Sequence, residues 1–190
     1  LRMENSLSNA LALFRSEHKR LPKGELQNLE VTEIFKQTLT MFEPMTRAKN
    51  INVVPPHKAI TGRITAHEEP VRQIVVNLVS NAIKYTPPDG QIRVGLHDNA
   101  NELMIHISNS GHGIPAEAIP HLFTKFYRSG EDRAAGKRIP GTGLGLNIVH
   151  KAVESLGGQI YVKSKPGELT LFLVRLPKRE EQAESSGASI

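Results

Sequence analysis

The sequence predicts an α/β two-layer sandwich, a mixed and mostly antiparallel sheet covered on one face by about three helices. Segments with apolar residues at three- and four-residue spacing are separated from segments in which every second residue is apolar, which is typical of helices packed on a sheet. A glycine-rich region over residues 109–144 shows little periodicity and indicates a long functional loop. With 190 residues, 38% of them hydrophobic, the chain can bury a core.

The first two expected elements are amphipathic helices separated by a break. Residues 1–19 carry a helical apolar stripe, and a proline and a glycine then predict a linker over residues 21–27. The second helix should begin after an N-cap at Thr32 and end near Asn50. Because the chain begins with Leu1 rather than methionine, we expect an excised fragment.

Further helices and strands follow in separate runs. A long helix should occupy about residues 68–85, and Pro87 should stop it. A later helix should run over about 144–156 and end at Gly157. The tail, residues 179–190, is polar and expected to be disordered. Short strands, the last four forming two hairpins, are expected at residues 51–54, 60–66, 92–96, 103–107, 159–164 and 169–176.

The composition excludes several classes of protein. The absence of cysteine excludes disulfide scaffolds, thiol catalysis and cysteine-based zinc sites. No segment approaches the roughly 18 apolar residues of a membrane helix, so a cytoplasmic domain without membrane contact is expected, although its parent protein can be membrane-anchored. The net charge of +5 suits a polyanion, but aromatic residues make up only 5% and no basic block is present, so no nucleic-acid binding is expected.

Four polar or aromatic residues follow one side of the helix expected at residues 68–85. Asn77, Asn81, Lys84 and Tyr85 are spaced at i, i+4, i+7 and i+8. A single asparagine on a helix is usually only solvated, but two at this spacing, followed by a cation and an aromatic ring, indicate a site. Asparagine amide oxygens are neutral ligands that suit Mg²⁺ when phosphates supply the charge.

Two glycine motifs lie at the two ends of the glycine-rich region. Residues 109–114 read Asn-Ser-Gly-His-Gly-Ile after a strand, which in isolation is equally consistent with a simple turn. Residues 141–146 read Gly-Thr-Gly-Leu-Gly-Leu and open a helix, where exposed backbone N–H groups form a site for phosphate oxygens. The spacing matches neither the dinucleotide fingerprint nor a P-loop.

Taken together and in this order, the motifs resemble those of the ATP-binding catalytic domain of sensor histidine kinases, in the GHKL superfamily shared with gyrase, Hsp90 and MutL. Residues 77–86 look like the N box, 109–114 the G1 box, 123–128 the F box and 141–146 the G2 box. The likeness covers residues 28–178. Residues 1–20 then look like the end of the second helix of a dimerisation hairpin.

The resemblance implies ATP and Mg²⁺ as cofactors and assigns roles by position. Asn81 would ligate the metal with Asn77 assisting, Lys84 would contact phosphate, and Tyr85 would pack near the base. Residues from about 115 to 140 would form a lid. The implied nucleotide-binding residues are Asn77, Asn81, Lys84, Tyr85, Asn109, Gly111, Gly113, Ile114, Arg128, Gly141, Thr142, Gly143, Leu144, Gly145 and Leu146.

The implied lid carries much of the positive charge of the chain. Residues 121–140 hold five basic side chains against two acidic ones, a net +3 of the total +5. Most of these side chains are expected to be solvated, with one or two closing on the γ-phosphate. The basic side chains are Lys125, Arg128, Arg133, Lys137 and Arg138.

Asn77 separates the subclasses of this superfamily. Gyrase-like and MutL-like ATPases carry a glutamate there that activates water, whereas an amide cannot act as a base. The expected reaction is therefore phosphoryl transfer to a histidine of the protein's own dimerisation domain, with a response regulator receiver downstream and a homodimeric parent protein. His18 and His67 are poor acceptor candidates, His67 being a helix cap instead, so the fragment alone should not autophosphorylate.

Asn109 departs from the family, in which an aspartate accepts a hydrogen bond from the adenine amino group. We expect weaker ATP binding and weaker discrimination against GTP, because an amide can present either a donor or an acceptor. A degenerate nucleotide-binding pseudokinase is therefore the alternative. A serine-directed anti-sigma kinase and a nucleic-acid binder are more distant alternatives, the former disfavoured by the N-terminal helix.

Overall fold

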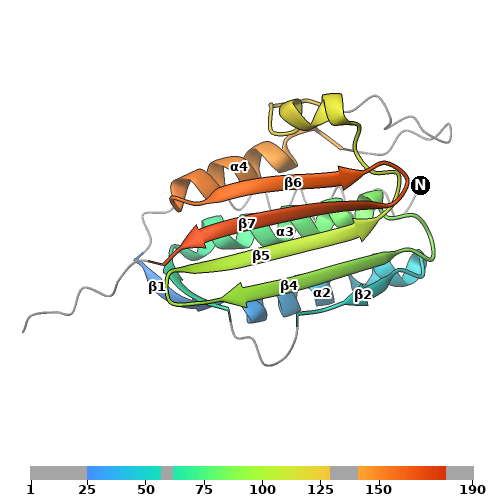
Figure 1. Cartoon of the computed structure of the whole chain (residues 1–190). Helices are drawn as coiled ribbons and strands as arrows, with labels where there is room; N and C mark the ends of the chain where they lie inside the picture. Colours follow the sequence, from blue (N-terminus) through green and yellow to red (C-terminus); the bar gives the residue numbers. More distant parts are fainter. Residues whose placement is uncertain (1–24, 57–61, 129–140, 179–190) are drawn as a thin grey trace, which may run out of the picture.

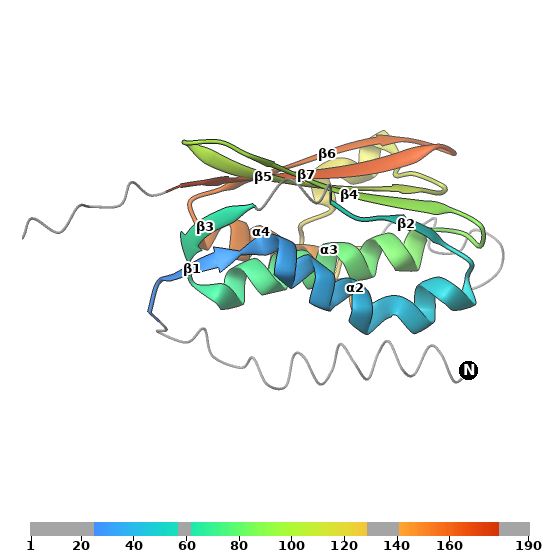
Figure 2. The same ribbon diagram turned by 90° about the horizontal axis from the view of Figure 1, so that it is seen from below.

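The computed structural model describes residues 25–56, 62–128 and 141–178, which form a sheet layer and a helix layer (Figures 1 and 2). The elements are, in order, β1 (Gln27–Glu30), α2 (Val31–Ala48), β2 (Asn52–Val54), β3 (Arg63–Ala66), α3 (Glu68–Tyr85), β4 (Gln91–Asp98), β5 (Glu102–Ser110), the 3₁₀ helix η1 (Ala116–His121), α4 (Gly145–Ser155), β6 (Gln159–Lys165) and β7 (Leu169–Pro177). The expected sandwich is confirmed.

The main sheet has five strands in the order β2-β4-β5-β7-β6. β2 runs parallel to β4 and the other pairs are antiparallel, so the sheet is mixed and mostly antiparallel. Both expected hairpins, β4–β5 and β6–β7, are present. Period-two burial along β4, β5 and β7 confirms that one face of these strands points into the core.

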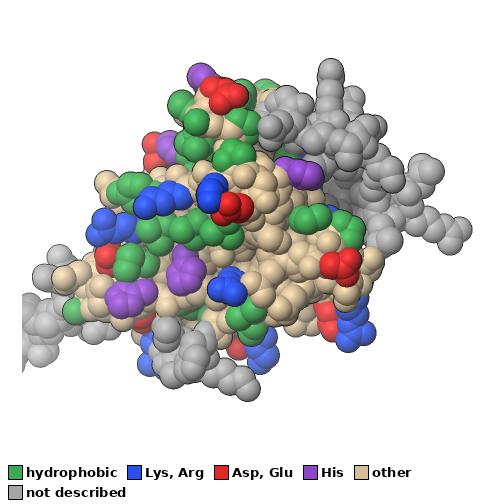
Figure 3. All heavy atoms as spheres, turned by 45° about the vertical axis from the view of Figure 1, so that its right-hand side comes forward, with side chains coloured by type: hydrophobic (Ala, Val, Ile, Leu, Met, Phe, Trp, Pro, Cys, Tyr) green, Lys and Arg blue, Asp and Glu red, His purple; other side chains and the backbone are tan. Residues whose placement is uncertain are grey.

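The three helices α2, α3 and α4 all lie on that one face of the sheet (Figure 2). α3 contacts both of its neighbours, which is why most of its side chains are buried. None of the helices among the described residues covers the opposite sheet face, and on that face hydrophobic side chains lie beside basic and histidine side chains (Figure 3). None of the described helices is long and apolar enough to span a bilayer.

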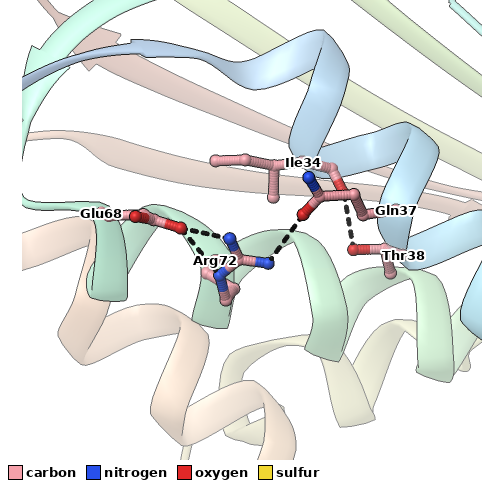
Figure 4. A network of polar contacts seen from close by, with 5 residues as sticks. All are labelled: Ile34, Gln37, Thr38, Glu68 and Arg72. Atoms are coloured by element: carbon pink, nitrogen blue, oxygen red, sulfur yellow. Dashed lines mark hydrogen bonds and ion pairs between the residues drawn. The ribbon is translucent and has the colours of Figure 1, made fainter.

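Polar contacts also join α2 to α3 (Figure 4). The Arg72 guanidinium contacts the Glu68 carboxylate one turn earlier on α3 and donates to Oε1 of Gln37 on α2 at 3.3 Å. Nearby, the buried Thr38 hydroxyl donates to the Ile34 carbonyl within α2, at 2.7 Å. The partly exposed cation therefore bridges the two helices at the start of α3.

The structure corrects the expected start of the second helix. α2 begins at Val31 after Glu30, so Thr32 is not its N-cap, and no side chain caps this end. Instead the Val31 amide donates to the Gly62 carbonyl at 2.9 Å, a backbone partner supplied by the segment before β3. The short β1–β3 sheet, which sequence patterns did not predict, brings that carbonyl into place.

Other boundaries agree to within a few residues. α3 spans the expected residues, Gly157 adopts the expected left-handed conformation after α4, and the strand expected at 60–66 is seen from Arg63. His67 stands at the N-cap of α3, but its side chain forms no capping hydrogen bond. The helix expected at 1–20, most of the linker at 21–27 and the tail at 179–190 lie outside the described residues, while Gln27 already belongs to β1.

Candidate functional site

A row of polar side chains crosses the sheet where β5 and β6 end and β7 begins. Asn109 of β5 pairs with Thr170 of β7, which pairs with Ser164 of β6. Asn109 and Thr170 are each only 6% exposed, although the next residues inward on the same face, such as Ile107 and Phe172, are apolar. The Ser164 and Thr170 hydroxyl oxygens lie 2.9 Å apart. Buried hydrogen-bonding groups thus lie at one end of the space between the sheet and the helices.

Thr170 and Ser164 were not predicted as site residues. The alternating pattern of β7 does place Thr170 in phase with the buried Phe172, Val174 and Leu176, which was a usable signal. Only the strand register, however, aligns Thr170 with Asn109.

The orientation of the Asn109 amide is set by one hydrogen bond. Its Nδ2 donates to the Ser110 carbonyl at 3.1 Å. With this orientation of the amide, Nδ2 donates within the chain, and Oδ1 is the atom that can accept a hydrogen bond. The arrangement preserves the acceptor that a carboxylate would provide at the same position.

The two asparagines of α3 face the first residue of α4. A Cβ atom placed on Gly145 would lie 3.2 Å from Oδ1 of Asn77, 3.8 Å from Oδ1 of Asn81 and 3.9 Å from Nδ2 of Asn81. Asn77 is buried and donates through Nδ2 to the Gln73 carbonyl at 2.8 Å, which leaves its oxygen toward Gly145. The missing side chain of Gly145 therefore lets the Asn77 oxygen and the Asn81 amide group approach the positive end of α4.

Lys84 and Tyr85 lie one to two turns further along α3. The Lys84 ammonium is 4.7 Å from the centre of the Tyr85 ring and 3.2 Å from its hydroxyl. The same ammonium is so close to Gly141 that a Cβ there would collide with it. The structure thus brings Lys84, from the motif at residues 77–86, beside Gly141, the first residue of the motif at 141–146.

Two segments on either side of residues 129–140 are hydrogen-bonded to each other. The Phe126 amide donates to the Gly143 carbonyl at 3.0 Å and Arg128 donates to the Gly141 carbonyl at 3.1 Å. Gly143 has φ +69°, and a Cβ on it would lie 2.7 Å from the Phe126 backbone, so this crossing requires glycine. Asn147, which was not predicted, adds a bond from its Nδ2 to the Phe123 carbonyl at 2.8 Å.

The lid expected over 115–140 is only partly described. Its first part contains the 3₁₀ helix Ala116–His121, and residues 129–140, with Arg133, Lys137 and Arg138, lie outside the described residues. Phe126 is 69% exposed and has φ +63°, an unusual conformation for a residue with a side chain.

The first glycine motif is attached to the β6–β7 turn. The Gly111 amide donates to the Glu168 carbonyl at 3.3 Å, and the His112 carbonyl accepts from the Gly167 amide at 2.7 Å. The Ile114 amide donates to Ser164 Oγ at 2.8 Å. These bonds hold the loop beside the polar row.

The remaining expected site residues surround the same end. Ile114 and Leu146 are partly buried against the core, Leu144 is half-buried at the start of α4, and Thr142 is exposed. Gly113, at φ +77°, packs against the backbone of Lys165 and Pro166. The tertiary structure therefore brings the sequence motifs together at one edge of the sandwich.

The charge of this edge is unlike that of an acidic metal centre. Within the described ranges, no group of three or more His, Asp or Glu side chains could hold a metal ion. The amides of Asn77 and Asn81 lie beside Gly145, and the cations Lys84 and Arg128 lie beside Gly141. Such a site suits a polyanion that brings its own metal ion.

Comparisons with known proteins give a consistent result. Residues 66–180 match the family described as histidine kinase-, DNA gyrase B- and HSP90-like ATPases. Sensor protein SrrB of Staphylococcus aureus is 40% identical over 108 residues, which cover 57% of this chain but 18% of that protein. The chain therefore spans less than a fifth of the curated relatives it matches.

Solved structures share the fold as well. The catalytic domain of histidine kinase ThkA superposes with a TM-score of 0.70 at 27% identity, over 82% of this chain and 99% of that one. A structure of ThkA in complex with the response regulator protein TrrA gives a TM-score of 0.69 at 26% identity, over 94% of this chain and 50% of that one.

Proposed function

This chain belongs to the family of histidine kinase-, DNA gyrase B- and HSP90-like ATPases, as an ATP-binding catalytic domain of the histidine kinase type, and we propose that it transfers the γ-phosphoryl group of ATP to a histidine of its own dimerisation domain. The observation that carries the proposal is the pair of asparagine amides facing the start of α4. It joins a metal-ligand pair to a phosphate-binding helix end.

The identity of Asn77 supports transfer rather than hydrolysis. Its Nδ2 is bonded to the Gln73 carbonyl, and an amide cannot remove a proton from an attacking water molecule. A histidine imidazole is already a nucleophile, so transfer to it requires mainly positioning and charge neutralisation. Asn77 and Asn81 are thus proposed to act by binding, not as acid–base groups.

Mg²⁺ fits the donor set at this edge. Asn81 Oδ1, with Asn77 Oδ1 assisting, would hold an ion whose other ligands are phosphate oxygens and water. When bound, the ion neutralises charge on the transferring phosphoryl group. The backbone N–H groups at Gly143 and Gly145, together with Lys84 and Arg128, would hold the phosphates.

The adenine ring is proposed to lie against the polar row. Asn109 Oδ1 would accept a hydrogen bond from the exocyclic amine, with Thr170 and Ser164 beside it. Gly111 and Gly113 permit close approach of the loop, and Tyr85 would pack near the base. Apolar walls would come from Ile114, Leu144 and Leu146.

The proposed partners follow from the same reaction. The acceptor histidine would be carried by a dimerisation domain of a homodimeric parent protein, and the phosphoryl group would pass on to a response regulator. The complex of the histidine kinase ThkA with the response regulator protein TrrA supports a response regulator as the downstream partner. A pseudokinase is less favoured, because the Asn109 amide is oriented with its oxygen as acceptor.

The Asn81→Ala variant tests the proposal. Removal of the metal-ligating oxygen should weaken Mg²⁺-dependent ATP binding by about ten-fold or more in calorimetry, because it removes a ligand from the bridged phosphates. The variant should also abolish acid-labile labelling of a separately supplied dimerisation domain.

Asn101→Ala, in the exposed β4–β5 turn, is the matched control and should bind and transfer like the unmodified chain. Wild-type ATP binding that does not respond to Mg²⁺ or to Asn81→Ala would contradict the proposed site. Release of free phosphate without transfer would contradict the proposed reaction.

A further inference from the structure

The C-terminal end of α3 is fixed by a side chain from another helix. Lys49, the residue that follows α2, donates from Nζ to the carbonyls of Ile83 at 2.8 Å, Lys84 at 3.1 Å and Thr86 at 3.0 Å. An ammonium group has three donors, so all of them are used on the backbone at this helix end.

These carbonyls are ones that α3 cannot satisfy by itself. The last four carbonyls of a helix have no partner within it, and they form the negative end of the helix dipole. α3 ends at Tyr85, and Thr86 follows it in an extended conformation before Pro87, without the left-handed residue that closes many helices. The Thr86 hydroxyl bonds the Ala82 carbonyl at 2.6 Å, and Lys49 takes carbonyls in the last turn and just beyond it.

The segment around Lys49 also holds the turn that follows α3. The Lys49 carbonyl accepts from the Asp89 amide at 2.9 Å, and Asn50 Nδ2 donates to the Asp89 carboxylate at 2.7 Å. The Asn52 amide adds a bond to the Gly90 carbonyl at 2.9 Å. The end of α3 and its exit turn are therefore attached to one short segment, residues 49–52.

The attached turn is the one that carries site residues. Lys84 contributes its own carbonyl to the Lys49 ammonium, and its side chain lies beside Gly141. The Tyr85 carbonyl packs so closely on Gly111 that a Cβ there would lie 2.6 Å away. A displacement of this turn would move the Lys84 ammonium, the Tyr85 ring and the support of the first glycine loop together.

The Lys49 ammonium lies among backbone carbonyl groups. The residue is half-buried, and its polar partners in the described part of the chain are carbonyls rather than carboxylates. Burial lowers the pKa of its ammonium group below the ordinary value of 10.5. Lys36, an exposed lysine within α2, forms an ion pair with Glu33 of the same helix instead.

We propose that Lys49 is a positioning residue for the nucleotide site, which fixes the last turn of α3 and so sets Lys84 and Tyr85 relative to Gly111 and Gly141. The inference rests on the proposed function, because it assigns Lys49 a part in nucleotide binding that it performs through the α3 backbone. Lys49 itself does not contact the nucleotide.

The test compares Lys49→Met with Lys36→Met in the whole 190-residue chain. Methionine keeps the apolar stem and removes the three donors, so MgATP affinity in calorimetry should fall by about ten-fold under conditions where the variant is folded. Lys36→Met should bind like the unmodified chain, and Lys49→Arg should recover part of the affinity because it keeps charged donors. A folded Lys49→Met variant within about two-fold of the unmodified affinity would overturn the proposal.

Two further measurements keep the outcomes separate. If Lys49→Met does not fold, Lys49→Gln, which keeps two donors, should still bind MgATP several-fold more weakly, and unchanged binding would overturn the proposal. If the unmodified chain binds no MgATP, the proposed function fails. The positioning role is then judged by amide NMR shifts of Lys84, Tyr85 and Gly111, which Lys49→Met should move and Lys36→Met should not, and unmoved shifts would overturn it.

Discussion

The two ends of the helix-covered face of β5 differ in chemistry. Toward the start of the strand, Leu103, Ile105 and Ile107 are completely or almost completely buried against the helices. At the last inward position the same face presents Asn109, equally enclosed but polar and bonded to the backbone beside it. The comparison teaches that one strand supplies both the packed core and the floor of the proposed site, so mutations a few residues apart should affect different properties.

The largest expected effect comes from the apolar end. Ile105→Ala removes a fully buried side chain that lies between Leu96 and Val174 in the register, and should lower the free energy of unfolding by about 2–5 kcal/mol. Nucleotide affinity measured on the folded fraction should stay close to that of the unmodified chain. Urea unfolding monitored by circular dichroism measures the change in stability.

Met104→Ala is the matched control, because Met104 lies next along β5 on the face without helices. Its effect on the unfolding free energy should be below about 1 kcal/mol. An equally large loss from Met104→Ala would contradict the assignment of the core to the helix-covered face.

An intermediate effect, on nucleotide binding as well as on stability, is expected at the polar end. Asn109→Asp should raise ATP affinity and the preference for ATP over GTP several-fold, because a carboxylate accepts from the adenine amine and repels the guanine edge. The same change loses the Nδ2 bond to Ser110 and should lower the free energy of unfolding by about 1–2 kcal/mol. Calorimetry with both nucleotides measures the first effect, and equal or tighter ATP binding by the unmodified chain would refute it.

The smallest expected effect is on the open face of the same strand. His106 lies so close to Gly95 of β4 that a Cβ there would collide with its ring, and partial burial lowers the pKa of His106 below 6.5. The imidazole therefore has a higher pKa in the unfolded chain than in the folded one, and it is protonated first in the unfolded chain as the pH falls through 6.5. The stability contributed by neutral His106 is lost progressively between pH 6.5 and the lower pKa of the folded state.

His106→Gln should consequently reduce the loss of stability as the pH falls below about 7, measured as the shift of the urea midpoint. His97→Gln, an exposed position on β4, controls for the removal of a histidine. An unchanged pH dependence in the His106 variant would show that the ring is not protected by its contact with Gly95.

Much of the fold could be predicted because its signals are local. The bounds of α3 follow from a continuous apolar pattern ended by Pro87, and both hairpins follow from alternation interrupted by turn residues. The pair Asn77 and Asn81 could be placed on one helix face by spacing alone. What spacing could not show is that the pair faces Gly145, more than sixty residues later in the chain.

The sequence by itself determined the class of sandwich, the order of the motifs and the residue types at the proposed nucleotide site, because helical and strand periodicity and turn chemistry act over a few residues. The tertiary structure alone decided the β1–β3 pairing, the alignment of Thr170 and Ser164 with Asn109, and the attachment of Lys49 to the end of α3. These contacts join segments that are distant in the chain, with the exception of the neighbouring Ser164 and Thr170. Backbone hydrogen bonds between such segments depend on register and packing, which no local pattern of side chains specifies.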